Sequence, residues 1–445
     1  MAEVSPARKG WERFPRNIQH SRRDTLLGEW PALPRPSGNT YRVTAVSTYV
    51  HLQCHPKGIE TLIKVWQLSC ELSVCYYPPI ITGMYNKFIV ETPVTFFLGA
   101  GASKLLGKLM MAEFIDYLER DKGFKGRSLF DEIVRQRRDL EFLFEELDEW
   151  ISKEYYAPSV TFQKGAIGAI ILSTGNDKEE RAFEERFQQL LIDARKLRSD
   201  LKREVFSSYR TINNRDAIVR LFQPIFDAVS TNQKLPSSPL VIFTTNYDPS
   251  IELFREALPT KYALHDGFFH DEDSMTYVWK KSQFDEFQPS KTKKDIVLFK
   301  IHGSTNWTRA GKRITKSATP IFVEDDSAHE NVLIYPATRK VAIDDPFFTG
   351  YDYFQKCMEN CSLCVVIGYS FRDYDSLTKF MSASRSNERL KLLVVDPKAR
   401  EICSSLKDRG IRAEPLAHSL SLRPDSDESK AYLVLLKAAV VSENL

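Results

Sequence analysis

The sequence lacks an uninterrupted apolar run long enough to cross a lipid bilayer. Its most apolar early stretch, TLIKVWQLSCELSVCYYPPIITG, is broken by Lys64, by Glu71 and by a pair of prolines. A membrane-spanning helix needs about 20 mostly apolar residues without such interruptions. The first residues include Glu3 and Pro6 and have no apolar core, which argues against a secretory signal. We therefore expect no membrane association.

Cysteine and net charge are also low. Seven Cys in 445 residues do not form the dense framework of a small secreted protein, so we expect reduced thiols and a cytoplasmic location. A formal net charge of +3 gives no electrostatic case for a direct nucleic-acid partner. A hydrophobic content of 42% is typical of a globular protein, and the length allows two or three domains.

Residues 1–83 differ from the remainder in composition and in sequence pattern. They are mildly basic, rich in proline and poor in helical periodicity. One interpretation is a partly disordered arm, and the other is a segment upstream of a natural start at Met84. We favour the second, because a glycine-rich first strand usually lies near the start of a nucleotide-binding domain.

A strongly helical region follows. Apolar residues recur at helical spacing within 131–153 and 178–205. The members of these stripes are Leu140, Leu143, Phe144, Leu147, Trp150 and Ile151, then Phe183, Phe187, Leu190, Leu191, Ala194, Leu197 and Leu201. A further helix is predicted over DAIVRLFQPIFDAV, bent or divided by Pro224. Core packing explains the stripes, and a partner surface is the alternative for any part left uncovered.

From Leu240 onward, short apolar runs alternate with helical stretches. The runs are LVIFTTN, IVLFKIHGS, NVLIYP, LCVVIGYS and LKLLVVDP, and FFLGAGAS precedes the helical region. Unalternating, β-branched runs of this length are typical of buried parallel strands. We predict an α/β fold, a doubly wound and mostly parallel Rossmann-like sheet with a large helical insertion after its first strand. The predicted ranges are 84–104 and 236–425 for the sheet domain, 105–235 for the insertion and 426–445 for a C-terminal helix or tail.

The run FFLGAGAS turns sharply at Gly99-Ala100-Gly101, as a strand does before a helix that faces a phosphate. The dinucleotide fingerprint requires a third glycine where Lys104 stands. The P-loop pattern is closer, since Gly107-Lys108 supply its end. However, Ala102 replaces its first glycine and Leu109 its Ser/Thr. A P-loop ATPase is therefore disfavoured, and a turn without a ligand stays open.

Polar residues follow the other strands. In TTNYD, Asn246 and Asp248 stand two apart and could reach one ligand, although Asp248 also suits a helix N-cap. In KIHGS, His302 lies where a base could face a cleft, with a structural role as the equal alternative. Gly368 and Ser370 end another strand.

Asp396 ends the last of these strands. Its carboxylate is placed for the hydroxyls of a ribose, and an N-cap role is the rival.

The ordered set GAGAS, TTNYD, KIHGS, IGYS and VVDP resembles the sirtuin family, over roughly Pro93 to Pro397. It is most similar to the divergent sirtuin-like domains of bacterial antiphage defence systems, in which HGS-x-NW, I-x-P-x-T-x-K (here LIYPATRK) and IGYS-x-x-x-x-D recur. Protein-deacylating sirtuins carry two zinc-binding CxxC pairs, whereas this sequence has only Cys357, Cys361 and Cys364 in CMENCSLC. Packing is the expected role of these cysteines, and we predict no metal.

The resemblance implies an enzyme that cleaves NAD⁺ with water, giving nicotinamide and ADP-ribose. It implies His302 as general base, Asn246 as the residue that orients ribose and water, and Asp248 on the nicotinamide side. The implied NAD-binding residues are Gly99, Ala100, Gly101, Ser103, Thr245, Gly368, Ser370 and Asp396.

By the same resemblance, we expect NAD depletion in antiphage defence by abortive infection. We also expect a homo-oligomer and an external trigger, such as a HerA-like ATPase partner. A sirtuin-type protein deacylase and a non-catalytic NAD or ADP-ribose sensor are the alternatives.

Overall fold

The computed structural model describes residues 85–155, 177–230, 238–324, 328–336, 344–418, 420 and 427–442. Backbone contacts divide the chain into two units, 1–80 and 81–445, and all described residues belong to the second. The interpretations offered for residues 1–83 therefore lie outside the described residues, as do Thr338 and Lys340 of LIYPATRK. Within the described residues, no helix combines the length and apolarity needed to span a bilayer.

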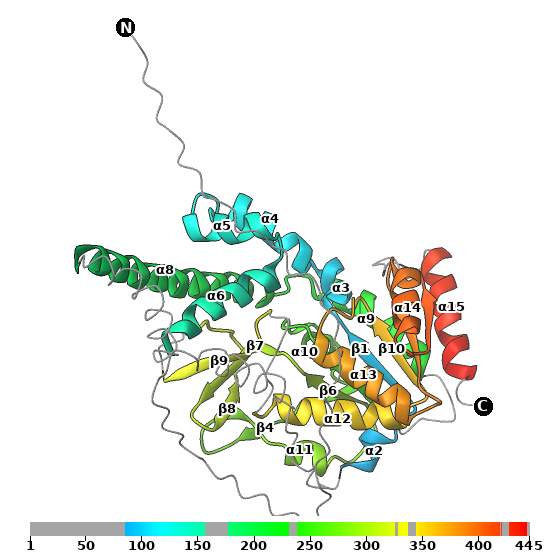
Figure 1. Cartoon of the computed structure of the whole chain (residues 1–445). Coiled ribbons are helices and arrows are strands. Elements are labelled where there is room, and N and C mark those ends of the chain that lie inside the picture. The colour runs from blue at the N-terminus through cyan, green and yellow to red at the C-terminus, as the bar shows by residue number, and fades with distance from the viewer. Residues whose placement is uncertain are drawn as a thin grey trace, which may run out of the picture. The chain divides into compact units, whose positions relative to one another are not determined.

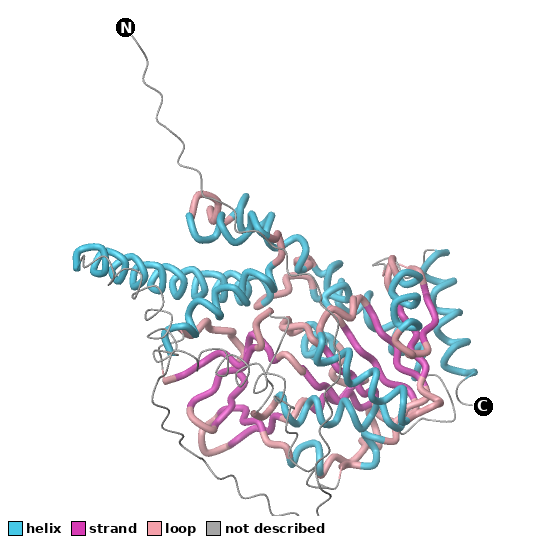
Figure 2. Tube along the Cα trace, in the orientation of Figure 1, coloured by secondary structure: helices cyan, strands magenta, loops and turns pink. Residues whose placement is uncertain are grey.

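A seven-stranded sheet forms the centre of this unit, and every neighbouring pair in it is parallel. In spatial order the strands are β12 (Ala413–Leu416), β11 (Lys391–Val395), β10 (Leu363–Ile367), β1 (Val94–Leu98), β2 (Leu240–Thr244), β6 (Lys294–Lys300) and β3 (Tyr262–His265). Figures 1 and 2 show this sheet with helices on both sides. The predicted doubly wound α/β fold is confirmed.

Both faces of the sheet are buried, which explains why its strands are apolar without alternation. One face packs against α12 (Phe347–Asn360), α13 (Tyr374–Ser386) and α14 (Ala399–Asp408). The other packs against α9 (Arg215–Ser230), α10 (Ser250–Ala257) and α15 (Asp427–Ser442). In β1, Phe97 belongs to the first core and Phe96 to the second, and all five strand residues are buried.

A second, antiparallel sheet was not predicted. Its order is β4 (Phe268–Asp271), β5 (Thr276–Trp279), β8 (Arg313–Lys316), β7 (Gly303–Ala310) and β9 (His329–Leu333). The prediction of a buried parallel strand at NVLIYP is therefore wrong, because only its first three residues belong to a strand, the end of β9, which is antiparallel to β7. Only Val332 of β9 is buried, whereas His329 and Glu330 are exposed. A short apolar run does not reveal its hydrogen-bonding partner.

A helical segment separates β1 from β2 along the chain, as predicted. It contains α3 (Ala100–Ser103), η2 (Lys104–Leu106), α4 (Met111–Asp121), α5 (Ser128–Gln136), α6 (Leu140–Tyr155) and α8 (Asp177–Tyr209). These helices build a core of their own, with Phe114, Leu143 and Leu201 fully buried. Of the stripe on α8, Leu191 is buried but Leu190 is 38% exposed.

Helix α9 also lies in the range predicted as insertion, but it packs on the sheet. Its Phe226 ring contacts Phe96 of β1 at 5.5 Å between centroids. Pro224 lies inside α9, which continues to Ser230 and is not divided. The short helices α2 (Lys87–Val90) and α11 (Ser282–Asp285) complete the described elements.

Candidate active site

The glycine turn after β1 packs against the backbone of the turn after β10. Gly99 N donates to Ile367 O at 2.9 Å, and Gly101 N donates to Gly368 O at 2.9 Å. A Cβ on Gly368, whose φ is +62°, would lie 2.4 Å from Ala102 N. Backbones approach this closely only where side chains are absent. The glycines are therefore required for packing between the two turns, a reason that the sequence did not suggest.

Asn246 joins the loop after β2 to this glycine turn. Its Nδ2 donates to Gly99 O at 2.9 Å and to Ser103 Oγ at 3.1 Å. Its backbone N–H donates to Thr244 Oγ1 at 3.0 Å. With Nδ2 held by two acceptors, Oδ1 is the part of the amide that can accept a hydrogen bond from a ligand.

Asp248 has a different environment. It is 2% exposed, and its Oδ1 accepts from Ser250 N at 3.1 Å at the start of α10. The N-cap of α10 is Pro249, so this contact is a local turn before the helix and not the N-cap offered as the alternative. Its predicted role beside nicotinamide stays a prediction.

A buried ammonium group ties the loop after β2 to the loop after β6. Lys300 Nζ donates to Asp248 O at 2.7 Å, to Ser304 Oγ at 2.6 Å and to Glu252 Oε1 at 3.1 Å. The side chains of Lys300 and Glu252 are only 1% and 9% exposed. Lys300 therefore links the loop that carries Asn246 to the loop that carries His302.

His302 follows β6 and is buried against two helices. Its Nε2 lies 3.0 Å from Asp373 Oδ2 and 3.0 Å from Tyr351 OH. Asp373 is the N-cap of α13, where its Oδ1 accepts from Asp375 N and its Oδ2 accepts from Ser376 Oγ at 2.8 Å. Burial raises the pKa of Tyr351 well above its usual value, and the Asp373 charge adds to this rise. The phenol therefore stays protonated.

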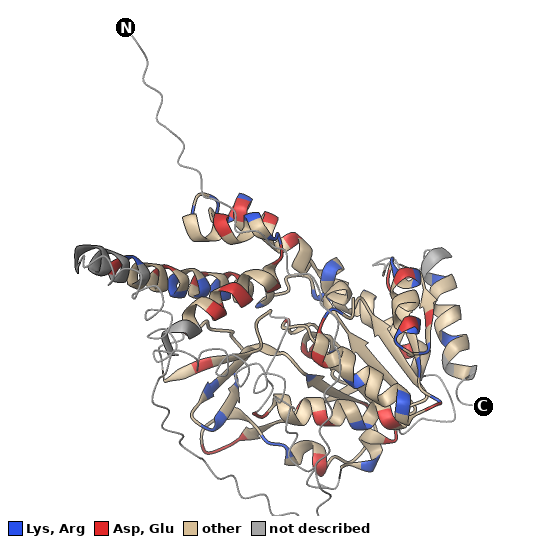
Figure 3. Cartoon of the chain, in the orientation of Figure 1, with Lys and Arg blue, Asp and Glu red and all other residues tan. Residues whose placement is uncertain are grey.

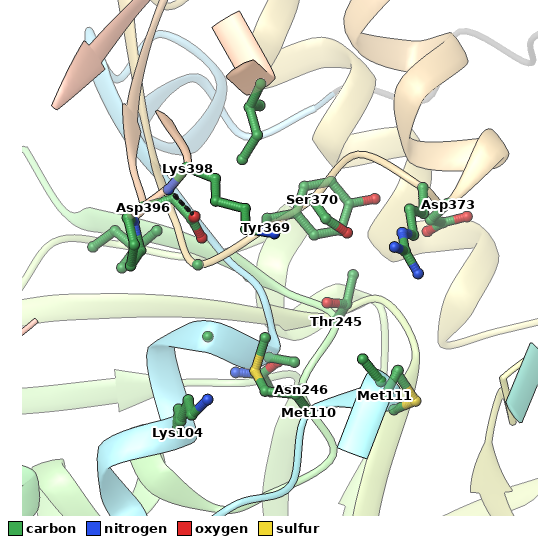
Figure 4. Close-up of a pocket in the computed structure, with 18 of the residues that line it drawn as sticks. Lys104, Met110, Met111, Thr245, Asn246, Tyr369, Ser370, Asp373, Asp396 and Lys398 are labelled. Carbon is green, nitrogen blue, oxygen red and sulfur yellow. Dashed lines mark hydrogen bonds between the residues drawn. The ribbon is translucent and has the colours of Figure 1, made fainter. Parts of the chain in front are cut away.

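A cavity of about 850 Å³ opens at the carboxyl ends of β1, β2, β10 and β11. In Figure 4, Ser370 and Asp373 lie on one side, Asn246 and Met110 on the other, and Thr245 between them. The predicted site residues that line the cavity are Ala100, Gly101, Thr245, Asn246, His302, Gly368, Ser370 and Asp396. Gly99, Ser103 and Asp248 are not among its lining residues.

The helical insertion supplies another wall of the cavity. Met110 and Met111 line it at the start of α4, Arg138 and Asp139 between α5 and α6, and Tyr209 at the end of α8. The sequence placed all predicted site residues on strand ends, so this contribution was missed. It arises because the segment between β1 and β2 folds back over the edge of the sheet where ligands bind in open α/β folds.

The turn after β10 contains a strained residue. Phe371 has φ +57°, a conformation that bulky residues rarely adopt. Its ring is buried against Tyr369 and Phe380, at centroid distances of 4.9 and 5.3 Å. The residues on either side, Ser370 and Arg372, both line the cavity. The strain thus keeps the ring in the core while its neighbours face the site.

Asp396 is not the N-cap of α14, which is Lys398, and its predicted contact with a ribose stays a prediction. Its Oδ1 accepts from Lys398 N at 2.8 Å, a local turn that Figure 4 shows, and the residue also lines the cavity. Only one carboxylate oxygen is used in this contact, so the other can accept from a hydroxyl of a bound ligand.

Lys108, the lysine of the P-loop-like pattern, is directed elsewhere. Its Nζ donates to Ser208 O at 2.9 Å and to Thr211 O, at the end of α8. Burial lowers the pKa of Lys108. It closes the carbonyl end of a helix and does not line the cavity.

The three cysteines of CMENCSLC are fully buried in the core between the sheet and α12. Burial raises the pKa of Cys361 to about 12, and it raises the pKa of Cys357 and Cys364 as well. Across the described ranges, no three His, Cys, Asp or Glu residues are grouped as metal ligands.

The sequence interpretation also missed two residues that contact His302. These are Asp373 and Tyr351, the hydrogen-bonding partners of His302. The family pattern IGYS-x-x-x-x-D points to Asp375, two residues beyond Asp373. The available signal was the helix start Asp373-x-x-Ser376, which is typical of an N-cap and does not indicate contact with a histidine 71 residues away.

Comparison with known proteins adds a family match to this geometry. Residues 240–413 match the model of the SIR2-like domain. This SIR2-like region contains Asn246, His302, Ser370, Asp373 and Asp396, and it begins after the glycine turn and the insertion. No curated protein matches the chain.

Solved structures of Sir2 homologues also match the chain. A Sir2 homologue in complex with NAD is 10% identical with a TM-score of 0.33, and the match covers 80% of this chain and 92% of that one. A mutant Sir2 homologue in complex with ADP-ribose is 12% identical with a TM-score of 0.31, covering 80% and 96%.

Proposed function

We propose that the protein binds NAD⁺ in the cavity at the strand ends and hydrolyses the bond between nicotinamide and ribose. The observation that carries this proposal is that Asn246, His302, Ser370 and Asp396 of the SIR2-like region line one cavity together with the glycine turn. The volume of about 850 Å³ lies within the usual range of roughly 300–1,000 Å³ for small-molecule sites.

The cavity lining fits the parts of NAD⁺. Ala100 and Gly101 present little side chain, so the pyrophosphate can approach their backbone. Asp396 can accept from the hydroxyls of the adenosine ribose. Asn246, with its amide fixed by Gly99 and Ser103, can orient the nicotinamide ribose and the attacking water.

The reaction needs one proton acceptor. As the C1′–N bond breaks, nicotinamide leaves as a neutral molecule with the bonding electron pair, and the ribose develops oxocarbenium character. Water then attacks C1′ and gives its proton to His302. The products are nicotinamide, ADP-ribose and one proton. The wall that the insertion adds to the cavity would help to fix the ribose relative to the base.

The alternative acceptor is an acylated lysine, as in a protein deacylase. The surroundings of the cysteines support hydrolysis, because these thiols pack in the core and could ligate zinc only if that core opened. A non-catalytic sensor would bind NAD⁺ without releasing nicotinamide.

Nicotinamide release from NAD⁺ by the purified full chain, with and without an acyl-peptide, distinguishes the three functions. We expect release without peptide, and a loss of about 100-fold or more in His302→Ala. The matched control is His270→Ala, on β4 outside the cavity lining, which should retain the wild-type rate. Release only with peptide would identify a deacylase. Unchanged release by His302→Ala would refute the mechanism.

We also propose, from the family resemblance, that this activity depletes NAD in antiphage defence and is restrained by assembly with an activating partner. A HerA-like ATPase is the partner class that the resemblance suggests, and the helical insertion is the proposed contact surface. Its position as a wall of the cavity supports this, because a partner bound there could alter access to the site.

A further inference from the structure

A buried polar cluster adjoins the cavity at His302. It contains the imidazole of His302, after β6, and the phenol of Tyr351, on α12. The carboxylate of Asp373, at the N-cap of α13, and the hydroxyl of Ser376, on α13, complete it. The side chains of His302 and Asp373 are only 4% and 5% exposed. Groups buried this deeply hold their hydrogen-bond partners in a defined geometry.

The hydrogen bonds show that Asp373 is a carboxylate acceptor. Its Oδ1 accepts from the backbone N–H of Asp375 at 3.2 Å, and its Oδ2 accepts from Ser376 Oγ at 2.8 Å. Both contacts favour the ionised form, as does the start of the 13-residue helix α13. An ionised carboxylate has no proton to donate. The imidazole nitrogen 3.0 Å from Oδ2 must therefore be the donor.

We infer that Asp373 is a positioning residue that holds His302 in the tautomer with its proton on Nε2, and so fixes the ring that accepts the proton during NAD⁺ hydrolysis. This inference rests on the proposed function for its last step only. The tautomer is argued from the contact with Asp373, because a neutral imidazole has one N–H and one lone pair and the carboxylate oxygen takes the N–H. Tyr351 OH, 3.0 Å from the same Nε2, completes the fixed orientation of the ring.

The charge of Asp373 also stabilises the protonated imidazole that forms when His302 accepts a proton. Other titratable groups face this cluster from each packed element. Tyr351 and Tyr369 are kept neutral, since burial raises the pKa of both well above the usual value. Lys379 Nζ lies 5.7 Å from the centre of the Tyr351 ring.

Two further carboxylates, Asp375 on α13 and Glu141 on the cavity wall, act on the phenols of the cluster through their charge. Asp373 is the carboxylate whose contact with the ring is a hydrogen bond of 3.0 Å.

The test is the tautomer and pKa of His302, read by nitrogen NMR of the full chain with ¹⁵N-labelled histidine. His302→Gln identifies the resonances. In the wild type, the neutral ring should carry its proton on Nε2. Asp373→Asn keeps an oxygen that can cap α13, but it presents an amide donor to the ring. We expect the proton to move to Nδ1 and the pKa of His302 to fall by about one unit or more.

A matched control is Asp139→Asn. Asp139 also lines the cavity and accepts from two backbone N–H groups at the start of α6, but its ion pair is with Arg137. This variant should leave the tautomer and pKa of His302 as in the wild type. An Nδ1–H tautomer in the wild type overturns the inference, and this outcome can be read even if Asp373→Asn does not fold. An Asp373→Asn spectrum identical to the wild type also overturns it.

The effect of Asp373 on catalysis is tested by the steady-state kinetics of nicotinamide release. Asp373→Asn should lower kcat for nicotinamide release at least about tenfold with little change in KM, and move the acid limb of the pH profile to lower pH. The direction follows because the base works in its neutral form, and loss of the carboxylate lets the ring deprotonate at lower pH. If His302→Ala abolishes release but Asp373→Asn changes neither kcat nor the acid limb, this inference fails alone. If the wild type releases nothing even when activated, the proposed function fails, whereas the NMR result stands.

Discussion

Gly368 has to satisfy two separate requirements at the edge of the site. Its φ of +62° disfavours any side chain, and a Cβ there would contact the glycine turn at 2.4–2.5 Å. The same contact places Gly99 and Gly101 beside the IGYS turn, so the two turns are built against each other. Asn246 is then fixed by the same turn through Gly99 O and Ser103 Oγ. Small residues at this point therefore set the position of Asn246.

Gly368→Ala should lower the free energy of unfolding by about 2–4 kcal/mol, because backbone strain and overpacking add at this position. Gly410→Ala is the matched control. Gly410 has φ +77° but open space around its Cβ position, so it should lose only about 1–2 kcal/mol. Urea unfolding of the full-length variants measures both. Equal losses would show that strain alone, and not contact between the turns, constrains Gly368.

Among the secondary-structure elements, the loops after β2 and β6 are joined by Lys300. This lysine is the last residue of β6, and its ammonium group reaches the carbonyl of Asp248 and the carboxylate of Glu252 at the start of α10. A buried ion pair contributes chiefly to geometry, because desolvation offsets most of its attraction. Its role here is to fix the distance between Asn246 and His302.

Lys300→Met should destabilise the fold by about 3 kcal/mol or more, because the Glu252 carboxylate is left buried without its partner. Lys300→Met/Glu252→Met should recover at least half of that loss, since no isolated charge remains. Lys300→Met, Glu252→Met and the double variant form a double-mutant cycle, in which denaturant unfolding measures the free energy of each variant. Strictly additive losses would contradict a coupled buried pair.

In the described unit as a whole, two layers line the cavity: the sheet and the helical insertion. The strand ends form one side, and α4, the segment between α5 and α6, and the end of α8 form another. Figure 3 shows acidic and basic residues interspersed along these helices. An exposed ion pair between Lys104 and Glu113, at 2.9 Å, joins η2 to α4. Exposed pairs of this kind contribute little to stability, so the insertion is held mainly by its apolar contacts.

NAD⁺ binding should therefore protect both layers from amide hydrogen exchange. We expect exchange to slow by about threefold or more in residues 109–113, 138–142 and 245–248 when NAD⁺ is present. At 100 times Kd, binding stabilises the fold by about 2.7 kcal/mol through mass action. The hairpin of β4 and β5 is the internal control and should not change beyond this global effect. Protection confined to 245–248 would show that the insertion does not contact the ligand.

The sequence determined by itself what depends on local pattern. Unalternating apolar runs predicted the parallel sheet, and the segment between β1 and β2 was recognised as helical from its spacing. Polar residues at strand ends could be placed at one edge, because parallel strands end together. Eight of the predicted site residues line one cavity for this reason. The functions proposed for them remain predictions.

Only the tertiary structure decided which groups meet across long distances in the chain. NVLIYP has the composition of a buried strand, yet its pairing with β7 was set by non-local hydrogen bonds. His302 has its partners 49 and 71 residues away, on helices whose sequences show only a cap and an apolar face. Such contacts depend on the packing of helices against the sheet, and packing is not encoded at any fixed spacing along the sequence.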